Sequence, residues 1–269
     1  MTTLPIEATR LLYAYDSDAP LDGQTQATEA SGPLRVERFQ FQSRHEQTVP
    51  GLILSDPDSD APRPLVLVAH PGTLDKSSDY VLSPARQWVA AGAICATIDQ
   101  AGHGERAQRP VSMEDFSRYP FRRMDHTIQT AVDWMRALDY LLERPDVDAE
   151  RVAFVGFSMG GMRGAPFVGL DERVKSAVFC ISGAARSLPD DPAERLAQEA
   201  TDPATFAPLM AGETLIVAGR NDDLITPESA QRFHDAMPDP KSIEWLDCGH
   251  WDFMPQGVEP IWPFLESKL

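Results

Sequence analysis

Short apolar runs recur along the chain, and polar turns that often contain glycine follow most of them. The runs are continuous rather than alternating, which is typical of strands buried on both faces of a sheet. They predict strands at 65–69, 93–98, 151–156, 174–181, 214–218 and 242–246. Two earlier segments, 36–41 and 49–54, alternate imperfectly and predict an antiparallel pair of strands near the N-terminus.

Apolar residues at helical spacing separate several of these strands. The clearest helix runs from Ile128 to Leu142, has one apolar face and is closed by Pro145. Further helices are expected at 83–91, directly after Ser158, at 227–236 and at 257–268. Pro166 lacks a backbone donor, so the helix after Ser158 should be short or kinked there. The alternation predicts an α/β fold with a mostly parallel central sheet and helices on both faces.

The length of the chain suggests one domain. A chain of 269 residues can build a single large α/β core, which we expect over 34–269. Residues 1–33 carry scattered Pro, Gly, Asp and Thr and predict an extended arm packed on that domain. Only the segments 105–124 and 183–212 could cover a site, and both are short, so we expect a small lid.

Acidic residues outnumber basic ones, 41 to 24, which gives a formal net charge of −17. This charge argues against nucleic acid or an anionic membrane surface as a partner, and it leaves small neutral substrates open. The sequence shows no signal-like segment and no apolar run near the ~20 residues of a membrane span. We therefore expect a cytoplasmic protein, whose oligomeric state the sequence does not reveal.

The cysteines and the metal-binding residue types form no recognisable framework. Cys95, Cys180 and Cys248 have no disulfide-type spacing and are expected to be free, buried thiols. No zinc-type His/Glu spacing and no phosphate-cradling Gly-Lys-Ser/Thr motif occurs. We therefore expect neither a metal nor another cofactor.

The strand at 151–156 leads into Gly156-Phe157-Ser158-Met159-Gly160, a Gly-x-Ser-x-Gly pattern. After an apolar run, this pattern is typical of a sharp strand-to-helix turn that exposes the serine hydroxyl. Strand and helix come so close at such a turn that its two glycine positions have no room for a side chain. Ser158 is therefore a candidate nucleophile, although the five residues alone also fit a glycine-rich turn with a serine helix cap.

A serine nucleophile needs a base to accept its proton, and the base needs a carboxylate to orient it. His250 follows the last predicted strand, and Asp222 follows the strand at 214–218. The carboxyl ends of parallel strands share one edge of the sheet, so these side chains should meet there. The order Ser158, Asp222, His250 along the chain fits an α/β-hydrolase.

The sequence resembles the α/β-hydrolase superfamily, and more narrowly its dienelactone-hydrolase and acetyl-xylan-esterase relatives. The resemblance runs from about residue 35 to the C-terminal helix. It is carried by 138–142, 145–152, 156–161, His70-Pro71-Gly72 with Lys76, 99–104, 219–222 and Gly249-His250. Dienelactone hydrolases have a cysteine at the nucleophile position, so Ser158 favours esterase chemistry.

The resemblance places the triad acid at the third residue after Gly219, which is Asp222. Asp223, however, lies at the more usual distance before Thr226-Pro227. Asp222 is the stronger candidate, and Asp223 stays open as the alternative.

Backbone N–H groups should hold the oxyanion that forms when an ester is attacked. Met159 begins the helix after the nucleophile, where its N–H has no partner within the helix. The resemblance points to Gly72 for the second donor, with Thr73 next, because Pro71 has no N–H. His70 is expected to fix that loop rather than to react.

Several residues near these positions are candidates for the substrate pocket. Phe157 and Met159 flank the nucleophile and Trp251 adjoins the base, with core packing as the alternative. His103 also follows a predicted strand, where it could be structural or contact substrate. A group of arginines could bind an anionic substrate but more often forms surface ion pairs: Arg106, Arg109, Arg118, Arg122 and Arg123.

The pattern as a whole predicts a cofactor-independent serine hydrolase. It would cleave small to medium carboxylic esters through an acyl-enzyme intermediate. The same three residues would also serve an amidase, an aminopeptidase or a thioesterase, since the fold does not select the leaving group. A non-catalytic binding module on this scaffold is a third hypothesis, although such proteins usually lack one of the three residues.

Overall fold

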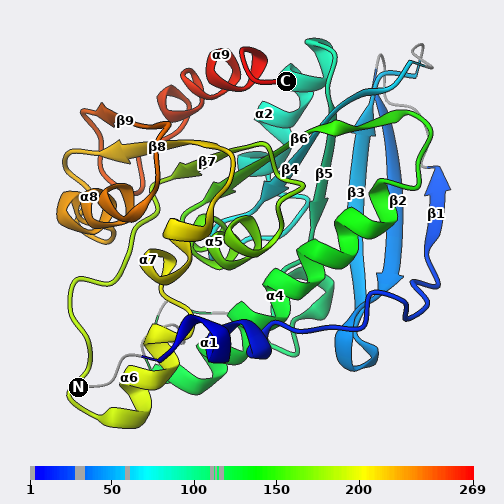
Figure 1. Cartoon of the computed structure of the whole chain (residues 1–269). Coiled ribbons are helices and arrows are strands. Elements are labelled where there is room, and N and C mark those ends of the chain that lie inside the picture. Colours follow the sequence, from blue (N-terminus) through cyan, green and yellow to red (C-terminus); the bar gives the residue numbers. More distant parts are fainter. Residues whose placement is uncertain (1–3, 28–33, 58–60, 110–111, 113, 115–117) are drawn as a thin grey trace.

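The computed structural model describes residues 4–27, 34–57, 61–109, 112, 114 and 118–269. Within this part of the chain, one nine-stranded sheet forms the centre of the molecule (Figure 1). Its strands lie in the order β1 (Gln24–Ala27), β2 (Arg35–Gln42), β3 (Thr48–Ser55), β5 (Ile94–Ile98), β4 (Arg63–Ala69), β6 (Val147–Phe157), β7 (Ser176–Cys180), β8 (Glu213–Gly219) and β9 (Lys241–Leu246).

Pairing directions divide the sheet into two parts. The strands from β5 to β9 are parallel to one another, whereas β1, β2 and β3 are antiparallel, and β3 also pairs antiparallel with β5. The predicted α/β fold, its mostly parallel sheet and the antiparallel pair at β2 and β3 are therefore confirmed. The strand β1 adds a third antiparallel strand that the sequence pattern did not predict.

Helices cover both faces of the sheet, so each face has its own hydrophobic core (Figure 1). On β4, Leu65 and Leu67 belong to one core, and Val66 and Val68 belong to the other, because successive side chains point to opposite faces. The first core includes α4 (Pro120–Leu141), α5 (Met159–Leu170) and α8 (Pro227–Ala236), and the second includes α2 (Asp79–Ala90) and α9 (Ile261–Glu266). The three cysteines are free and buried, as predicted.

The helix after Ser158 differs from the prediction. It does not stop at Pro166 but continues to Leu170, so the expectation of a short helix was wrong. A proline removes only one backbone donor, the one that would reach the carbonyl of Met162. Phe167 and Val168, one turn further on, are buried in the first core. Their burial stabilises the last turn despite the missing hydrogen bond.

The N-terminal arm lies below the sheet in Figure 1, where its first helix is close to the segment 183–212. The predicted arm contains α1 (Ile6–Leu12) and β1, and Tyr13 after α1 donates a hydrogen bond to the carbonyl of Ala200 at 2.8 Å. Because β1 pairs with β2, part of the arm belongs to the sheet itself. Residues 28–33 lie outside the described residues, and the domain boundary after residue 33 stays a prediction.

The two expected lid segments differ in how far they are described. The segment 183–212 contains α6 (Pro192–Glu199), α7 (Pro203–Phe206) and the 3₁₀ turn η3 (Ala207–Leu209). In 105–124, residues 110, 111, 113 and 115–117 lie outside the described residues. The remaining 3₁₀ turns are η1 (Arg44–Glu46), η2 (Gly104–Arg106) and η4 (Gln256–Val258).

Candidate active site

The turn between β6 and α5 presents Ser158. Its backbone has φ of 50° and ψ of −117°, a left-handed conformation that non-glycine residues rarely adopt and that functional sites often contain. A Cβ atom on Gly156 would lie 2.5 Å from the Cα atom of Gly161, and one on Gly160 would lie 2.5 Å from the carbonyl oxygen of Ala69. Both glycines are therefore required for the close approach of strand and helix.

Ser158, His250 and Asp222 are connected by hydrogen bonds. Ser158 Oγ lies 3.0 Å from His250 Nε2, and His250 Nδ1 lies 2.8 Å from Asp222 Oδ2. The other oxygen of Asp222 accepts the backbone N–H groups of Leu224 and Ile225, at 2.9 and 2.7 Å. All three side chains are buried. This arrangement can move a proton from the hydroxyl to the imidazole beside a fixed carboxylate.

The structure joins Asp222, and not Asp223, to His250. Asp222 is buried, whereas Asp223 is exposed. The loop that carries Asp222 is tied to the loop before His250, because the N–H of Asn221 donates to the carbonyl of Cys248 at 3.0 Å. This bond positions the two loops side by side with the Asp222 carboxylate directed at the imidazole.

The residues expected to hold the oxyanion lie around Ser158. Met159, Gly72 and Thr73 line the same cavity as the serine hydroxyl. Met159 is the first residue of α5, so its N–H has no acceptor within the helix. Thr73 has φ of 63°, which marks a tight backbone turn after β4. Met159, Gly72 and Thr73 therefore stay the candidates for the oxyanion donors.

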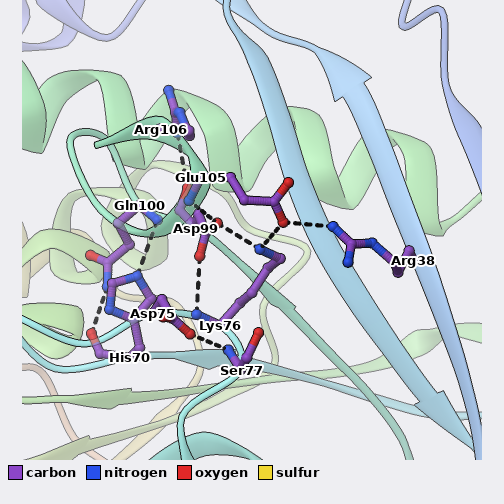
Figure 2. Close-up of polar contacts among 9 residues, drawn as sticks. All are labelled: Arg38, His70, Asp75, Lys76, Ser77, Asp99, Gln100, Glu105 and Arg106. Atoms are coloured by element: carbon purple, nitrogen blue, oxygen red, sulfur yellow. Dashed lines mark hydrogen bonds and ion pairs between the residues drawn. The ribbon is translucent and has the colours of Figure 1, made fainter. Parts of the chain in front are cut away.

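His70 connects the loop after β4 to the loop after β5 through Gln100 (Figure 2). Its Nε2 accepts the N–H of Gln100 at 3.2 Å, and its own carbonyl accepts the Gln100 side-chain amide at 2.6 Å. Its Nδ1 lies 2.8 Å from the carbonyl of Pro71 and donates to it, because Nε2 is already an acceptor. Burial lowers the pKa of His70 to about 4, so the imidazole is neutral at pH 7.

A buried ion pair ties the loops after β4 and β5 together (Figure 2). Lys76 Nζ lies 2.7 Å from Asp99 Oδ2 and 2.6 Å from Glu105 Oε1. The two oxygens of Asp99 also accept the backbone N–H groups of Lys76 and Glu105, at 3.1 and 2.9 Å. Lys76 and Asp99 belong to the motifs of the family resemblance, but their contact is not evident from the sequence. The network holds the loop that carries Gly72 and Thr73.

A cavity of about 490 Å³ opens over Ser158 and His250. Its lining is largely apolar and includes residues that the sequence analysis did not identify, such as Tyr80, Met162, Ile181 and Leu224. The segment 183–212 contributes Gln198, Thr201 and Asp202 to the lining, as an expected cover of the site would. Nothing in the local sequence pattern marks these residues, since they converge only through the packing of distant elements.

Of the predicted pocket residues Phe157, Trp251 and His103, only Trp251 lines this cavity. Trp251 lines the cavity and is 74% exposed, with its ring edge-on to His250. Phe157 does not line it, because alternation along β6 directs its side chain into the second core, against Tyr80 and Phe253. His103 is also not part of this cavity. It is buried beside a neighbouring cavity, with its Nδ1 3.1 Å from the carbonyl of Ala101.

Among the described residues, no group of three or more His, Cys, Asp or Glu side chains is arranged to hold a metal ion. In the same part of the chain, none of the helices has both the length and the apolar character to cross a bilayer.

The strand order, the strained turn at Ser158 and the position of the hydrogen-bonded residues at the carboxyl ends of parallel strands define an α/β-hydrolase fold. No protein-family model matches the chain. It is 26% identical over 180 residues to YtaP of Bacillus subtilis (strain 168), whose assignment as a hydrolase is provisional. This match covers 63% of this chain and 60% of YtaP, so the chain spans 60% of the length of that curated relative.

Solved structures place the chain beside esterases of the same fold. The acetyl xylan esterase from Paenibacillus sp. R4 superposes with a TM-score of 0.79 at 22% identity, over 98% of this chain and 93% of that one. A cold-adapted esterase from an Arctic intertidal metagenomic library superposes with a TM-score of 0.75 at 23% identity, over 93% of this chain and 99% of that one. The chain therefore has the α/β-hydrolase fold and resembles its esterase members.

Proposed function

We propose that the protein is a serine hydrolase that cleaves carboxylic esters through an acyl-enzyme intermediate. The observation that carries this proposal is the continuous hydrogen-bond path from Ser158 Oγ through His250 to Asp222, open to a cavity. Esterases among the similar solved structures support ester chemistry over the amidase, aminopeptidase and thioesterase alternatives. A non-catalytic binding module would not need the strained serine turn.

In the proposed reaction, Ser158 Oγ attacks the ester carbonyl carbon while His250 Nε2 accepts the hydroxyl proton. Asp222 holds the imidazole in the orientation that allows this transfer and stabilises its charged form. The N–H of Met159 and that of Gly72 or Thr73 would hold the oxyanion. His250 then gives its proton to the leaving alcohol, and a water molecule repeats the sequence at the acyl group. This mechanism requires neither a metal nor another cofactor.

The cavity favours small to medium substrates. Its volume of about 490 Å³ lies in the lower part of the range for small-molecule sites, and the surface of its lining is mostly apolar. We therefore expect short-chain and medium-chain esters to be preferred over long lipids. A cytoplasmic location and the absence of a nucleic-acid partner are predictions from composition alone.

The test is turnover of p-nitrophenyl butyrate by the wild type, Ser158→Ala and Ser176→Ala. Ser176 is a buried serine at the start of β7, so its substitution controls for the loss of a buried hydroxyl. We expect Ser158→Ala to lose at least about 10³-fold in kcat and the control to keep wild-type activity. The matching p-nitroanilide distinguishes an amidase. Full turnover by Ser158→Ala, or no turnover and no labelling of folded wild type by a fluorophosphonate, would refute the proposal.

A further inference from the structure

A second cavity of about 510 Å³ adjoins the one over Ser158, and its lining is strongly basic. The contrast with the net charge of −17 for the whole chain makes this concentration of positive charge conspicuous. Asp125 is the only Asp or Glu among its described lining residues. Five arginines line the cavity: Arg106, Arg109, Arg122, Arg123 and Arg163.

Arg163 is a buried cation without a counter-ion. It lies on α5, is 4% exposed and forms no ion pair within the described part of the chain. There, its one protein hydrogen bond runs from Nη1 to the carbonyl of Ala101 at 3.1 Å. Burial, followed by the positive charges of Arg106 and Arg123, lowers its pKa to about 9. Burial of a guanidinium with five N–H donors costs free energy unless acceptors bind to it. The surroundings of Arg163 are therefore suited to an anionic ligand.

The neighbouring Arg106, in contrast, forms an ion pair with a buried carboxylate. Its Nη1 lies 2.6 Å from Asp133 Oδ2 and also donates to the carbonyl of Asp99. The carboxylate of Asp133 is fully buried and takes a further hydrogen bond from Gln129. The positive charge of Arg106 is therefore neutralised by Asp133, whereas Arg163 has no such partner among the described residues.

The basic cavity and the cavity over the nucleophile have two lining residues in common. Arg163 and Arg123 line both. Arg163 lies on α5, five residues or about 7.5 Å along the axis from Ser158, which precedes the helix as its N-cap. Because Arg163 and Ser158 line one cavity, a ligand there can contact both. The carboxylate of Asp202, on the wall of the first cavity, accepts the backbone N–H groups of Ala185 and Ala204 and forms no ion pair with Arg163 within the described residues.

We propose that Arg163 and the arginines around it bind an anionic group, a carboxylate or a phosphate, carried by the ester that Ser158 attacks. The substrate is then an acidic ester whose anion lies a few bonds from the scissile carbonyl. This inference rests on the proposed ester hydrolysis and narrows its substrate class. The guanidinium supplies paired N–H donors whose geometry matches both oxyanions.

The experiment compares acidic esters with neutral esters of equal length. Monoethyl glutarate and monoethyl adipate are paired with ethyl pentanoate and ethyl hexanoate, and acetyl esters of a hydroxy acid and of a glycol phosphate test an anion on the alcohol side. Hydrolysis is monitored through the acid that it releases. The quantity compared is the ratio of kcat/KM for the acidic ester to kcat/KM for the neutral ester. We expect a ratio of at least about 10 in the wild type. The preferred ester distinguishes carboxylate from phosphate.

Variants assign the preference to Arg163. Arg163→Gln should lower the acidic-to-neutral ratio about 10- to 100-fold, because it removes a charge-assisted hydrogen bond while keeping a polar side chain. Arg163→Lys should retain part of the ratio. Arg151→Gln, which removes an arginine that pairs with Asp148 at the opposite end of β6, should leave the ratio unchanged. If Arg163→Gln does not fold, Arg122→Glu on the same cavity should lower the ratio instead.

A wild type that hydrolyses both ester classes equally, or an unchanged ratio in Arg163→Gln and Arg122→Glu, would overturn the inference. Failure of the proposed function looks different, since no ester would then be cleaved. In that case calorimetry with glutarate, adipate and inorganic phosphate tests the cavity by itself. Binding by the wild type that weakens in Arg163→Gln supports an anion site, and no binding overturns it.

Discussion

The carboxylate of Asp222 contacts the imidazole of His250 with one oxygen, at 2.8 Å, while its other oxygen accepts two backbone N–H groups. The backbone bonds fix the carboxylate so that it cannot turn away from the imidazole. Because both side chains are buried, water does not compete for this contact. The pair is therefore prearranged before any substrate binds.

Substitution of Asp222 tests the role of this contact. In Asp222→Asn we expect kcat for p-nitrophenyl butyrate to fall about 10³- to 10⁴-fold, because an amide cannot stabilise the charged imidazole and selects the wrong tautomer. Asp223→Asn is the matched control and should stay within about twofold of wild type, since Asp223 is exposed. The assignment of the acid to Asp222 fails if both variants lose activity equally.

The buried ion pair between Lys76 and Asp99 should matter for stability. In Lys76→Met we expect the free energy of unfolding to fall by about 3–5 kcal/mol, because a buried carboxylate is left without its cation. Arg38→Met removes a half-exposed partner of Glu105 and should cost no more than about 1 kcal/mol. Urea unfolding measures both values.

A double substitution separates the charge penalty from lost packing. If the loss in Lys76→Met comes from the unpaired carboxylate, then adding Asp99→Leu should recover more than half of it. A double variant as unstable as the sum of its two single variants would contradict this explanation.

Buried histidines should make the protein less stable in acid. The folded pKa of His70 is lowered by burial to about 4, and an unfolded histidine has a pKa of about 6.5. Between pH 6.5 and about pH 4 this histidine is protonated in the unfolded state but not in the folded state. The free energy of unfolding therefore decreases as the pH is lowered through this range. His70 alone contributes roughly 3 kcal/mol to this loss. Burial lowers the pKa of His103 and His126 as well, in the same direction.

Urea unfolding at a series of pH values checks this prediction. The slope of the unfolding free energy against pH is proportional to the number of protons taken up on unfolding. Between pH 6.5 and 4, His70→Gln should lower that number by up to one. His45→Gln, at an exposed position, should leave the slope unchanged. An unaltered slope in His70→Gln would show that this histidine is not the group responsible.

Gly156 should tolerate no side chain. Its Cβ would meet the backbone of Gly161 at 2.5 Å, so Gly156→Ala must separate β6 from α5 and displace Ser158. We expect at least about 100-fold loss of kcat, because a displacement near 1 Å disrupts catalytic geometry. Gly92→Ala is the control. At Gly92, φ is 104° but no atom lies within 4 Å of the added Cβ, so about 1–2 kcal/mol of stability should be lost without loss of kcat.

The sequence by itself determined the strand and helix positions of the parallel part of the sheet and the turn that carries Ser158. A short apolar run such as that of β4, bounded by proline and glycine, favours a strand buried on both faces, and the glycines beside Ser158 reflect a local steric requirement. These features depend on neighbours along the chain. They can therefore be predicted from local pattern, whereas β1 and α7 have only four residues each. The helix α6 was not predicted, although Asp191 followed by Pro192 is a typical helix start.

Only the tertiary structure decided which distant residues meet. The choice between Asp222 and Asp223 depends on the pairing of β8 with β9, which sets Gly219 opposite Leu246 and so brings their loops together. The direction of Phe157 depends on which face of β6 is covered. The burial of Arg163 without an ion pair among the described residues depends on how α5 packs against distant segments. Such relationships arise from packing between elements far apart in the chain, and one-dimensional patterns do not encode them.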